Sequence, residues 1–258
     1  MIYDLTTFAG EYDLLEIRLN VLNDFVDKFV ICESMETFSG RPKPLYWIER
    51  DRDRFEEWED KIEYIIPNYG EDELIMEMMV NRPYVDQLPF KKAFYQKESL
   101  RNALEDAQDD DLVIYGDADE VINPDILDSI DDKVYKLRQL AYSYFLNNRS
   151  QEDWRGTIVT KYKNLKNGSL NDMRANPVNI MENGGWHWTN LGGLEAVKRK
   201  IESYDHQEVN IPWVVDGLEE RMTMNVDFLG RGYRMWPSEE GLPQYVLENK
   251  KRYKHLWK

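Results

Sequence analysis

The sequence contains a single cysteine, Cys32, in 258 residues, and only three histidines. One cysteine cannot form an intramolecular disulfide, and zinc sites built from several cysteines are excluded by the count. Nothing in the chain therefore requires an oxidising compartment. No histidine lies near Cys32 in sequence, which also disfavours a cysteine nucleophile.

Basic residues and long apolar runs are scarce as well. Lys and Arg number 33 against 49 Asp and Glu, so the formal net charge is −16. A surface for nucleic acid or anionic membrane needs a dominant basic field, so we expect neither partner. No apolar run approaches the ~18–20 residues of a bilayer span, and no signal-peptide pattern is present. We expect a soluble, cytoplasmic protein.

Two common catalytic signatures are missing. The chain has no Gly-x-x-x-x-Gly-Lys-Ser/Thr loop, which disfavours a P-loop nucleotide hydrolase. It has no Gly-x-Ser-x-Gly segment either, which disfavours a serine hydrolase of the α/β type.

What the sequence does have is material for a core, since 42% of its residues are hydrophobic and 13% aromatic. The first part alternates strand and helix patterns: a strand at 2–8, a helix at 11–23, and strands at 25–32 and 62–66. This βαβ order predicts an α/β fold, a mostly parallel Rossmann-like sheet flanked by helices with a small antiparallel part. We find no repeat or linker, so we expect one domain over 1–258.

The later elements are less regular. A helix at 93–107 leads into a short apolar strand at 112–116, and a half-exposed strand follows at 134–146. Four more segments complete the prediction: two or three strands within 154–188, helices at 195–202 and 244–257, and a solvated helix face at 49–60. We expect residues 68–92 to be an irregular surface excursion.

The apolar strand at 112–116 runs directly into Asp117-Ala118-Asp119. Residues two apart in an extended chain project to the same side, so both carboxylates face one point at the carboxyl end of a strand. Two oxygen ligands with free coordination positions suit Mn²⁺ or Mg²⁺ bridging to a diphosphate. The inert alternative is an acidic turn that caps the segment after it.

A second segment, residues 183–193, combines paired glycines with Trp186, His187 and Trp188. The glycines permit close approach of a ligand, a flat aromatic face can stack on a sugar or base, and a neutral imidazole can bind metal. The inert alternative is a strand whose two tryptophans pack in the core and whose histidine is simply hydrogen-bonded.

Several blocks in order resemble glycosyltransferase family 17, the family of the enzyme that adds bisecting N-acetylglucosamine to N-glycans. They lie between residue 2 and about residue 208, at 2–4, 11–19, 26–34, 37–46, 117–124 and 184–187. The resemblance implies a GT-A type fold, a UDP-sugar donor, a glycan or polysaccharide acceptor, Mn²⁺ or Mg²⁺, and inversion at the anomeric carbon. It also implies a donor-binding half at 1–125 and an acceptor-side half at 126–258.

The resemblance assigns roles to individual positions. Asp117 and Asp119 match the family's Asp-x-Asp element and would hold the metal, with His187 or His206 as a third ligand. The donor would contact residues at the ends of two strands, in the preceding helix and in the Gly-Trp-His block: Glu33, Ser34, Arg101, Asp117, Trp186 and His187. The vertebrate enzyme's membrane anchor is absent here, which favours a microbial or viral enzyme that builds another glycan.

Inversion also needs a general base on the acceptor side. Glu195, which follows the Trp-His segment at the start of a predicted helix, is the first candidate, with Asp205 and Glu208 next. The inert alternative for Glu195 is a helix N-terminal acid that interacts with the helix dipole.

Two other functions remain open. A carbohydrate-binding module without turnover would stack sugars on Trp186, Trp188 and Trp213 and use the aspartates for a structural cation. Metal-dependent phosphoryl transfer at the acidic turn is the other, although the expected lysine partner and further clustered acids are missing from the sequence pattern.

Overall fold

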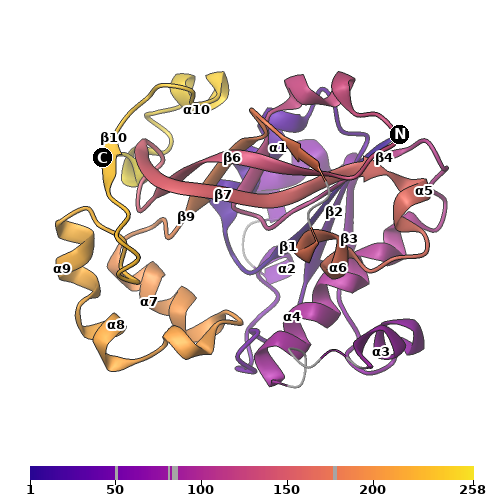
Figure 1. Cartoon of the computed structure of the whole chain (residues 1–258), viewed down its shortest axis with the longest axis horizontal. Helices are drawn as coiled ribbons and strands as arrows, with labels where there is room; N and C mark the ends of the chain where they lie inside the picture. Colours follow the sequence, from indigo (N-terminus) through magenta and orange to yellow (C-terminus); the bar gives the residue numbers. More distant parts are fainter. Residues whose placement is uncertain (50–51, 81, 83–86, 177–178) are drawn as a thin grey trace.

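A computed structural model describes residues 1–49, 52–80, 82, 87–176 and 179–258. The described strands form one ten-stranded sheet in the order β3-β2-β1-β4-β7-β6-β9-β5, with β10 paired to β7 and β8 to β6. The long β6–β7 pair crosses the molecule, with α7, α8 and α9 on one side below it and α3 and α4 on the other (Figure 1).

The first half of the sheet is parallel. β1 (Ile2–Phe8) lies between β2 (Lys28–Glu33) and β4 (Leu112–Tyr115), and β2 pairs with β3 (Ile62–Ile65). Strands in such a sheet are covered on both faces and are therefore nearly continuous apolar runs. The predicted α/β class with a helix-flanked, largely parallel central sheet is confirmed.

Alternate residues of these strands feed two separate cores. In β2, Phe29 and Ile31 pack with α1 (Tyr12–Leu22), whereas Val30 and Cys32 pack with η3 (Leu100–Leu104), which follows α4 (Leu88–Ser99). The carboxyl edge between the two layers is where a ligand site forms in such a sheet.

The second half is mainly antiparallel. β7 (Asn148–Lys161) runs antiparallel to β4 and β6 (Tyr135–Ser143), and β5 (Glu120–Ile122) runs antiparallel to β9 (Gly185–Thr189). β9 and β8 (Asn179–Met181) pair in parallel with β6, while β10 (Met235–Pro237) pairs antiparallel with β7.

The remaining described helical segments are short, and most lie in the connections between strands. They are α2 (Tyr46–Glu49), η1 (Arg52–Lys61), α3 (Glu73–Met79), η4 (Pro124–Ser129), α5 (Tyr162–Leu165), α6 (Leu170–Ala175), α7 (Leu194–Ser203), η5 (Gln207–Val209), α8 (Pro212–Asp216), α9 (Leu218–Thr223), α10 (Gln244–Glu248) and η6 (Lys254–Leu256). None of the helices in the described part of the chain combines the length and hydrophobicity that a bilayer span demands.

Three predicted segments differ from the structure. The described part of 68–92 contains α3 and the first turns of α4, so it is not wholly irregular. The helix predicted at 244–257 breaks into α10 and η6. The charge run at 49–60, of which residues 50 and 51 lie outside the described residues, is largely the 3₁₀ helix η1, and it buries Phe55 and Trp58 in the first core.

Candidate active site

A cleft of about 740 Å³ opens at the carboxyl edge of the parallel strands. Its walls come from the segment after β1, the loop after β2, α4, the turn after β4, the segment after β9, and α7. Its volume is in the range of pockets that bind small molecules and cofactors. The charged residues of the wall are Glu11, Asp13, Glu36, Arg41, Lys43, Arg54, Lys97, Asp117, Asp119, Arg199, Lys200, Glu202 and Asp205.

Asp117 and Asp119 both line this cleft, as their spacing at the end of β4 predicts. One carboxylate oxygen of Asp117 accepts from Arg174 Nη2 at 2.6 Å, and the other lies 3.3 Å from Lys97 Nζ. Burial opposes ionisation of Asp117, but the charges of Arg174 and Lys97 hold its pKa well below the usual range. Asp117 is therefore a carboxylate at any physiological pH.

Asp119 has a different set of neighbours. Its Oδ2 accepts from Lys200 Nζ at 3.0 Å and lies 3.8 Å from His187 Nε2. Burial raises the pKa of Asp119, whereas the positive charge of Lys200 and, when it is protonated, of His187 lowers it. The net shift of the pKa is downward. Lys200 Nζ also donates to Thr189 Oγ1 at 3.0 Å, so the ammonium lies beside the end of β9.

Glu120 turns away from the cleft into a buried polar network. Its Oε2 accepts from Thr157 Oγ1 at 2.8 Å and from Arg174 Nη1 at 3.0 Å. Its Oε1 accepts from Trp154 Nε1 at 2.9 Å and from Arg174 Nη2 at 2.6 Å. Arg174, on α6, therefore joins this buried carboxylate to Asp117 in the cleft.

Glycine makes room for the Glu120 carboxylate. A Cβ on Gly156 would overlap Glu120 Oε1, and a Cβ on Gly116 would overlap Thr157 Oγ1. Both glycines are thus required by packing of the network and not by an unusual backbone conformation.

Arg18 holds the same turn from behind. It is fully buried on α1, and its guanidinium donates to both carboxylate oxygens of Asp4 at 2.6 Å. Its Nη1 donates to the backbone carbonyls of Asp117 at 3.0 Å and Glu120 at 2.7 Å. A bidentate arginine of this kind fixes geometry, so the turn that carries the two aspartates is rigidly positioned.

His187 lies on β9 with its ring stacked on Trp154, at 3.9 Å between ring centroids and 16° between planes. The side chain is buried, and among the described residues Nδ1 has no hydrogen-bond partner. Burial lowers the pKa of His187, so the ring is neutral near pH 7, and His187 itself does not line the cleft.

Trp186 and Trp188 project to the other side of β9 from His187, as alternation predicts. Both are buried in a core with the C-terminal helices, where their indole nitrogens donate to the carbonyls of Gly241 and Leu146. Trp188 also borders the cleft, whereas Trp186 does not line it and packs in this core.

Glu33, expected to contact the donor, is fully buried and does not line the cleft. Its carboxylate accepts from Lys43 Nζ at 2.6 Å, Tyr64 Oη at 2.9 Å and the backbone N–H of Tyr46 at 2.8 Å. These bonds hold the loop after β2 in place. Ser34 accepts from the backbone N–H of Glu36 and likewise lies outside the cleft wall.

Arg101 is also placed elsewhere. Its guanidinium donates to the carbonyls of Leu165, Lys166 and Gly168 and so fixes the turn between α5 and α6. Lys97, one turn earlier in the chain on α4, reaches Asp117 together with Arg174.

Of the three candidate bases, the structure brings only Asp205 to the cleft. Glu195 has a side chain 73% exposed and pairs with Lys198 at 3.2 Å. Glu208 bonds to His206 at 2.6 Å. His206, the alternative third ligand, also packs edge-on against Phe90 of α4.

Glu11 is a cleft carboxylate that the sequence patterns did not single out. Its Oε2 accepts from the backbone N–H of Ala9 at 2.7 Å. The residue is open to the cleft, yet desolvation by the walls raises its pKa, with the Ala9 N–H opposing and Asp119 reinforcing the shift. Its position just before α1 was the available signal, since the segment after β1 borders any ligand at this edge.

For a metal ion, the cleft offers two carboxylate ligands and not a complete coordination sphere. Among the described residues, no group of three or more His, Cys, Asp and Glu side chains converges to hold an ion. Asp117 and Asp119 do fit Mg²⁺ or Mn²⁺ of the kind that binds one or two carboxylates and takes its other ligands from substrate phosphates.

The model of glycosyltransferase family 17 matches residues 1–213. The chain belongs to glycosyltransferase family 17. A "beta-1,4-mannosyl-glycoprotein 4-beta-N-acetylglucosaminyltransferase" from Homo sapiens is 30% identical over 112 residues, which is 43% of this chain and 20% of that protein. The Rattus norvegicus protein of the same name gives the same identity and coverage, so the match spans about a fifth of these curated relatives.

A solved structure, 4-diphosphocytidyl-2C-methyl-D-erythritolsynthase from Anaerococcus prevotii DSM 20548, resembles this family 17 chain only remotely. It aligns with a TM-score of 0.33 and 10% identity, covering 71% of this chain and 89% of that one. The family assignment rests on the sequence match.

Proposed function

We propose that this protein is a metal-dependent, inverting glycosyltransferase that moves N-acetylglucosamine from UDP-N-acetylglucosamine to a hydroxyl of a glycan or polysaccharide. The observation that carries the proposal is the pair Asp117 and Asp119, both ionised and both lining a cleft at the carboxyl edge of the parallel strands. The sugar is taken from the human and rat relatives, which are named as N-acetylglucosaminyltransferases, and the UDP-linked donor is what the family resemblance implies.

Departure of a nucleoside diphosphate builds negative charge on the leaving oxygens. Positive charge near these oxygens would stabilise it, from a metal ion or from basic side chains. Asp117 and Asp119 would hold Mn²⁺ or Mg²⁺, which stabilises that charge when bound. Lys97 and Lys200 bring two further positive charges to the same part of the wall. Cations in a partly enclosed site can stabilise charge where it develops, which favours the transition state over the ground state.

We assign the general base to Asp205. It is the only one of the three predicted candidates that lines the cleft, and it lies beyond α7 in the acceptor-side half. Its carboxylate takes the proton of the acceptor hydroxyl while that oxygen bonds to the anomeric carbon and the bond to the diphosphate breaks. Attack opposite the leaving group inverts the anomeric configuration.

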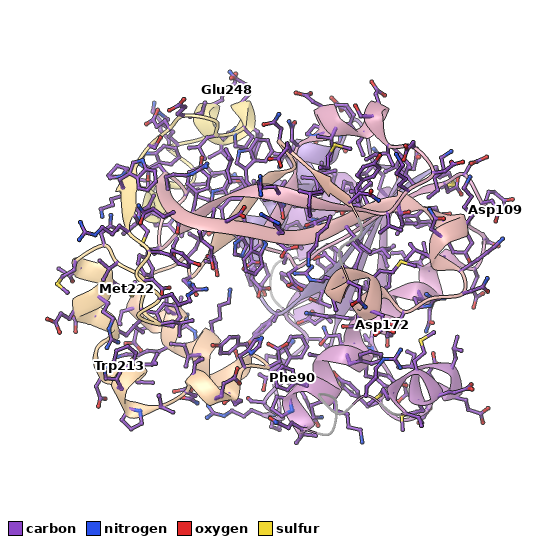
Figure 2. All side chains as sticks on the ribbon, in the orientation of Figure 1. Phe90, Asp109, Asp172, Trp213, Met222 and Glu248 are labelled. Atoms are coloured by element: carbon purple, nitrogen blue, oxygen red, sulfur yellow. The ribbon has the colours of Figure 1, made fainter. Side chains whose placement is uncertain are left out.

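The alternative, non-catalytic sugar binding, expects Trp186, Trp188 and Trp213 to form a stacking surface. Trp186 and Trp188 are buried at 8% and 0% exposure, so neither offers a face to a sugar ring. Trp213 is exposed, but it lies at the margin of the molecule on α8 and carries Arg221 over its ring (Figure 2). The three tryptophans therefore do not form one stacking platform.

The test is release of UDP from UDP-N-acetylglucosamine, with Mn²⁺ and a panel of glycan acceptors, by the wild-type protein, Asp205→Asn and Glu195→Gln. We expect acceptor-dependent release in the wild type, a loss of about 10²–10⁴-fold in kcat for Asp205→Asn and less than about threefold for Glu195→Gln. The reverse order of the two variants would return the base to Glu195. No release with any donor and acceptor would contradict the proposed activity.

A further inference from the structure

Each carboxylate of the 117–120 turn is matched by a cation. Lys97 lies 3.3 Å from Asp117, Lys200 lies 3.0 Å from Asp119, and Arg174 bridges Asp117 and Glu120 at 2.6 Å each. Three negative charges therefore meet three positive charges, and the cluster is close to neutral as a unit.

The two lysines differ from Arg174 in how they are held. Arg174 is fixed by the buried Glu120 network. Lys97 and Lys200 reach the turn from α4 and α7, two helices that lie apart in Figure 1, and both lysines line the cleft. A lysine ammonium sits on a flexible four-carbon stem and can move between neighbouring anions, whereas a bidentate guanidinium cannot do so without breaking its fork.

We propose that Lys97 and Lys200 are exchangeable counter-ions, which neutralise Asp117 and Asp119 in the free protein and transfer to a diphosphate when one enters. Divalent cation and nucleoside diphosphate then bind together, and neither binds tightly alone. This inference rests on the proposed function, because it takes the diphosphate of a sugar donor as the anion that receives the lysines.

The balance of charges in the cleft explains why the divalent cation and the diphosphate should bind together. A dication that approaches alone meets carboxylates already paired with lysines, so it has to displace a cation and leave that cation without a partner. A diphosphate that approaches alone is attracted by the lysines but repelled by the aspartates behind them. When both enter, the dication replaces the lysines on the aspartates and the lysines pair with phosphate oxygens, so every charge keeps an opposite neighbour.

The experiment measures Mn²⁺ binding to the whole protein by calorimetry and by the electron paramagnetic resonance signal of free Mn²⁺, without and with UDP. The variants are Lys97→Met, Lys200→Met and Lys200→Arg. Lys198→Met is the matched control, since Lys198 lies on the same helix, pairs with exposed Glu195 and does not line the cleft. Thermal unfolding confirms that each variant is folded.

In the wild type we expect UDP to tighten Mn²⁺ binding by at least about tenfold, and Mn²⁺ to tighten UDP binding by the same factor because coupling is reciprocal. Lys200→Met and Lys97→Met should bind Mn²⁺ alone about tenfold more tightly, while UDP in the presence of Mn²⁺ binds about tenfold more weakly. Lys200→Arg should keep UDP binding within about threefold, and Lys198→Met should match the wild type.

Two results would overturn the inference, and they differ in what they say about function. If UDP and Mn²⁺ both bind but without coupling, or if the lysine variants change neither affinity, the counter-ion role is wrong and the donor site stands. If UDP does not bind with or without Mn²⁺, both the inference and the proposed function fail.

Discussion

Arg174→Met is the substitution whose effect follows most directly from the geometry. The wild-type guanidinium makes bonds of 3.0 and 2.6 Å to Glu120 and one of 2.6 Å to Asp117. Glu120 is fully buried, so removal of Arg174 leaves a carboxylate in the interior without its counter-ion. Breaking a buried ion pair from one side costs about 3–5 kcal/mol.

We expect the lower end of that range, about 3 kcal/mol, because Glu120 keeps neutral donors. Thr157 and Trp154 still donate to it at 2.8 and 2.9 Å. For a chain of this size, 3 kcal/mol corresponds to a fall of about 6–12 °C in Tm. Arg174→Lys keeps the charge but not the two-pronged bonding, so about half of that loss is expected.

The assay is urea unfolding and Tm at pH 7 for Arg174→Met, Glu120→Gln and the double variant. Glu120→Gln removes the buried charge, so the double variant should be more stable than the sum of the two single losses predicts, by about 1–3 kcal/mol. Arg174 also helps to keep the pKa of Asp117 low against the opposing effect of burial. That stabilisation is present above the unfolded pKa of about 3.9 and is lost as pH falls through the lower folded value, so the wild type and the Arg174 variant should converge in acid.

A loss below about 1 kcal/mol for Arg174→Met, with additive single effects, would refute the reasoning, because it would mean that Glu120 does not depend on its ion pair. The reasoning would also be refuted if Arg174→Met lowered the free energy of unfolding by the same large amount in the wild type and in Glu120→Gln. Arg174 would then stabilise the protein only through the packing of α6.

Three more predictions address packing, chemistry and pH. Gly156→Ala should lower the free energy of unfolding by about 2–3 kcal/mol in urea, because its Cβ would overlap the Glu120 carboxylate; an unchanged midpoint would contradict this. Asp205→Asn should lower kcat while leaving KM for the donor within about threefold, and Glu195→Gln should change neither; equal kcat values in the two variants would remove Asp205 from the mechanism. Because burial lowers the pKa of His187, the unfolded state binds the proton first, so stability should fall below about pH 6.5 by up to about 1.4 kcal/mol per pH unit. Tm from pH 7.5 to 5.5 should show a shallower slope in His187→Gln, and equal slopes would mean that the ring protonates in the folded protein.

Local pattern was sufficient for the parallel half of the fold. The hydrophobic patterns of β1, α1 and β4 are each continuous along the chain. The secondary structure that these local patterns predict is the one that the tertiary structure contains. The position of Asp117 and Asp119 at the cleft also follows from local pattern, since the residues after a central strand lie at the carboxyl edge of such a sheet.

The elements that the sequence did not show have polar or interrupted patterns. The first half of β7, residues 148–155, is largely polar and half-exposed, so its strand character comes from pairing with β6. α4 begins at Leu88 because Pro89 is tolerated in the first turn of a helix, although the proline-containing sequence suggested a loop.

The cations of the site depend on contacts between distant parts of the chain. Lys97 and Lys200 reach the 117–120 turn from two different helices, α4 and α7, and only the folded structure brings them together. Glu33 is the reverse case, a residue that the sequence singled out for the site and that does not line the cleft. It ends a strand, as a donor ligand would, but the following loop folds back so that Lys43 and backbone N–H groups enclose its carboxylate.

The central claim is that the cleft binds a nucleotide sugar through Asp117 and Asp119. The most direct measurement is calorimetric titration of UDP and a panel of UDP- and GDP-sugars into the wild type and Asp119→Ala, each with and without Mn²⁺. We predict Mn²⁺-dependent binding of UDP and UDP-N-acetylglucosamine that falls by at least about a hundredfold in Asp119→Ala, with a Tm within a few degrees of the wild type because the changed side chain borders the cleft. Binding that is the same without Mn²⁺, or the same in Asp119→Ala, would contradict the claim.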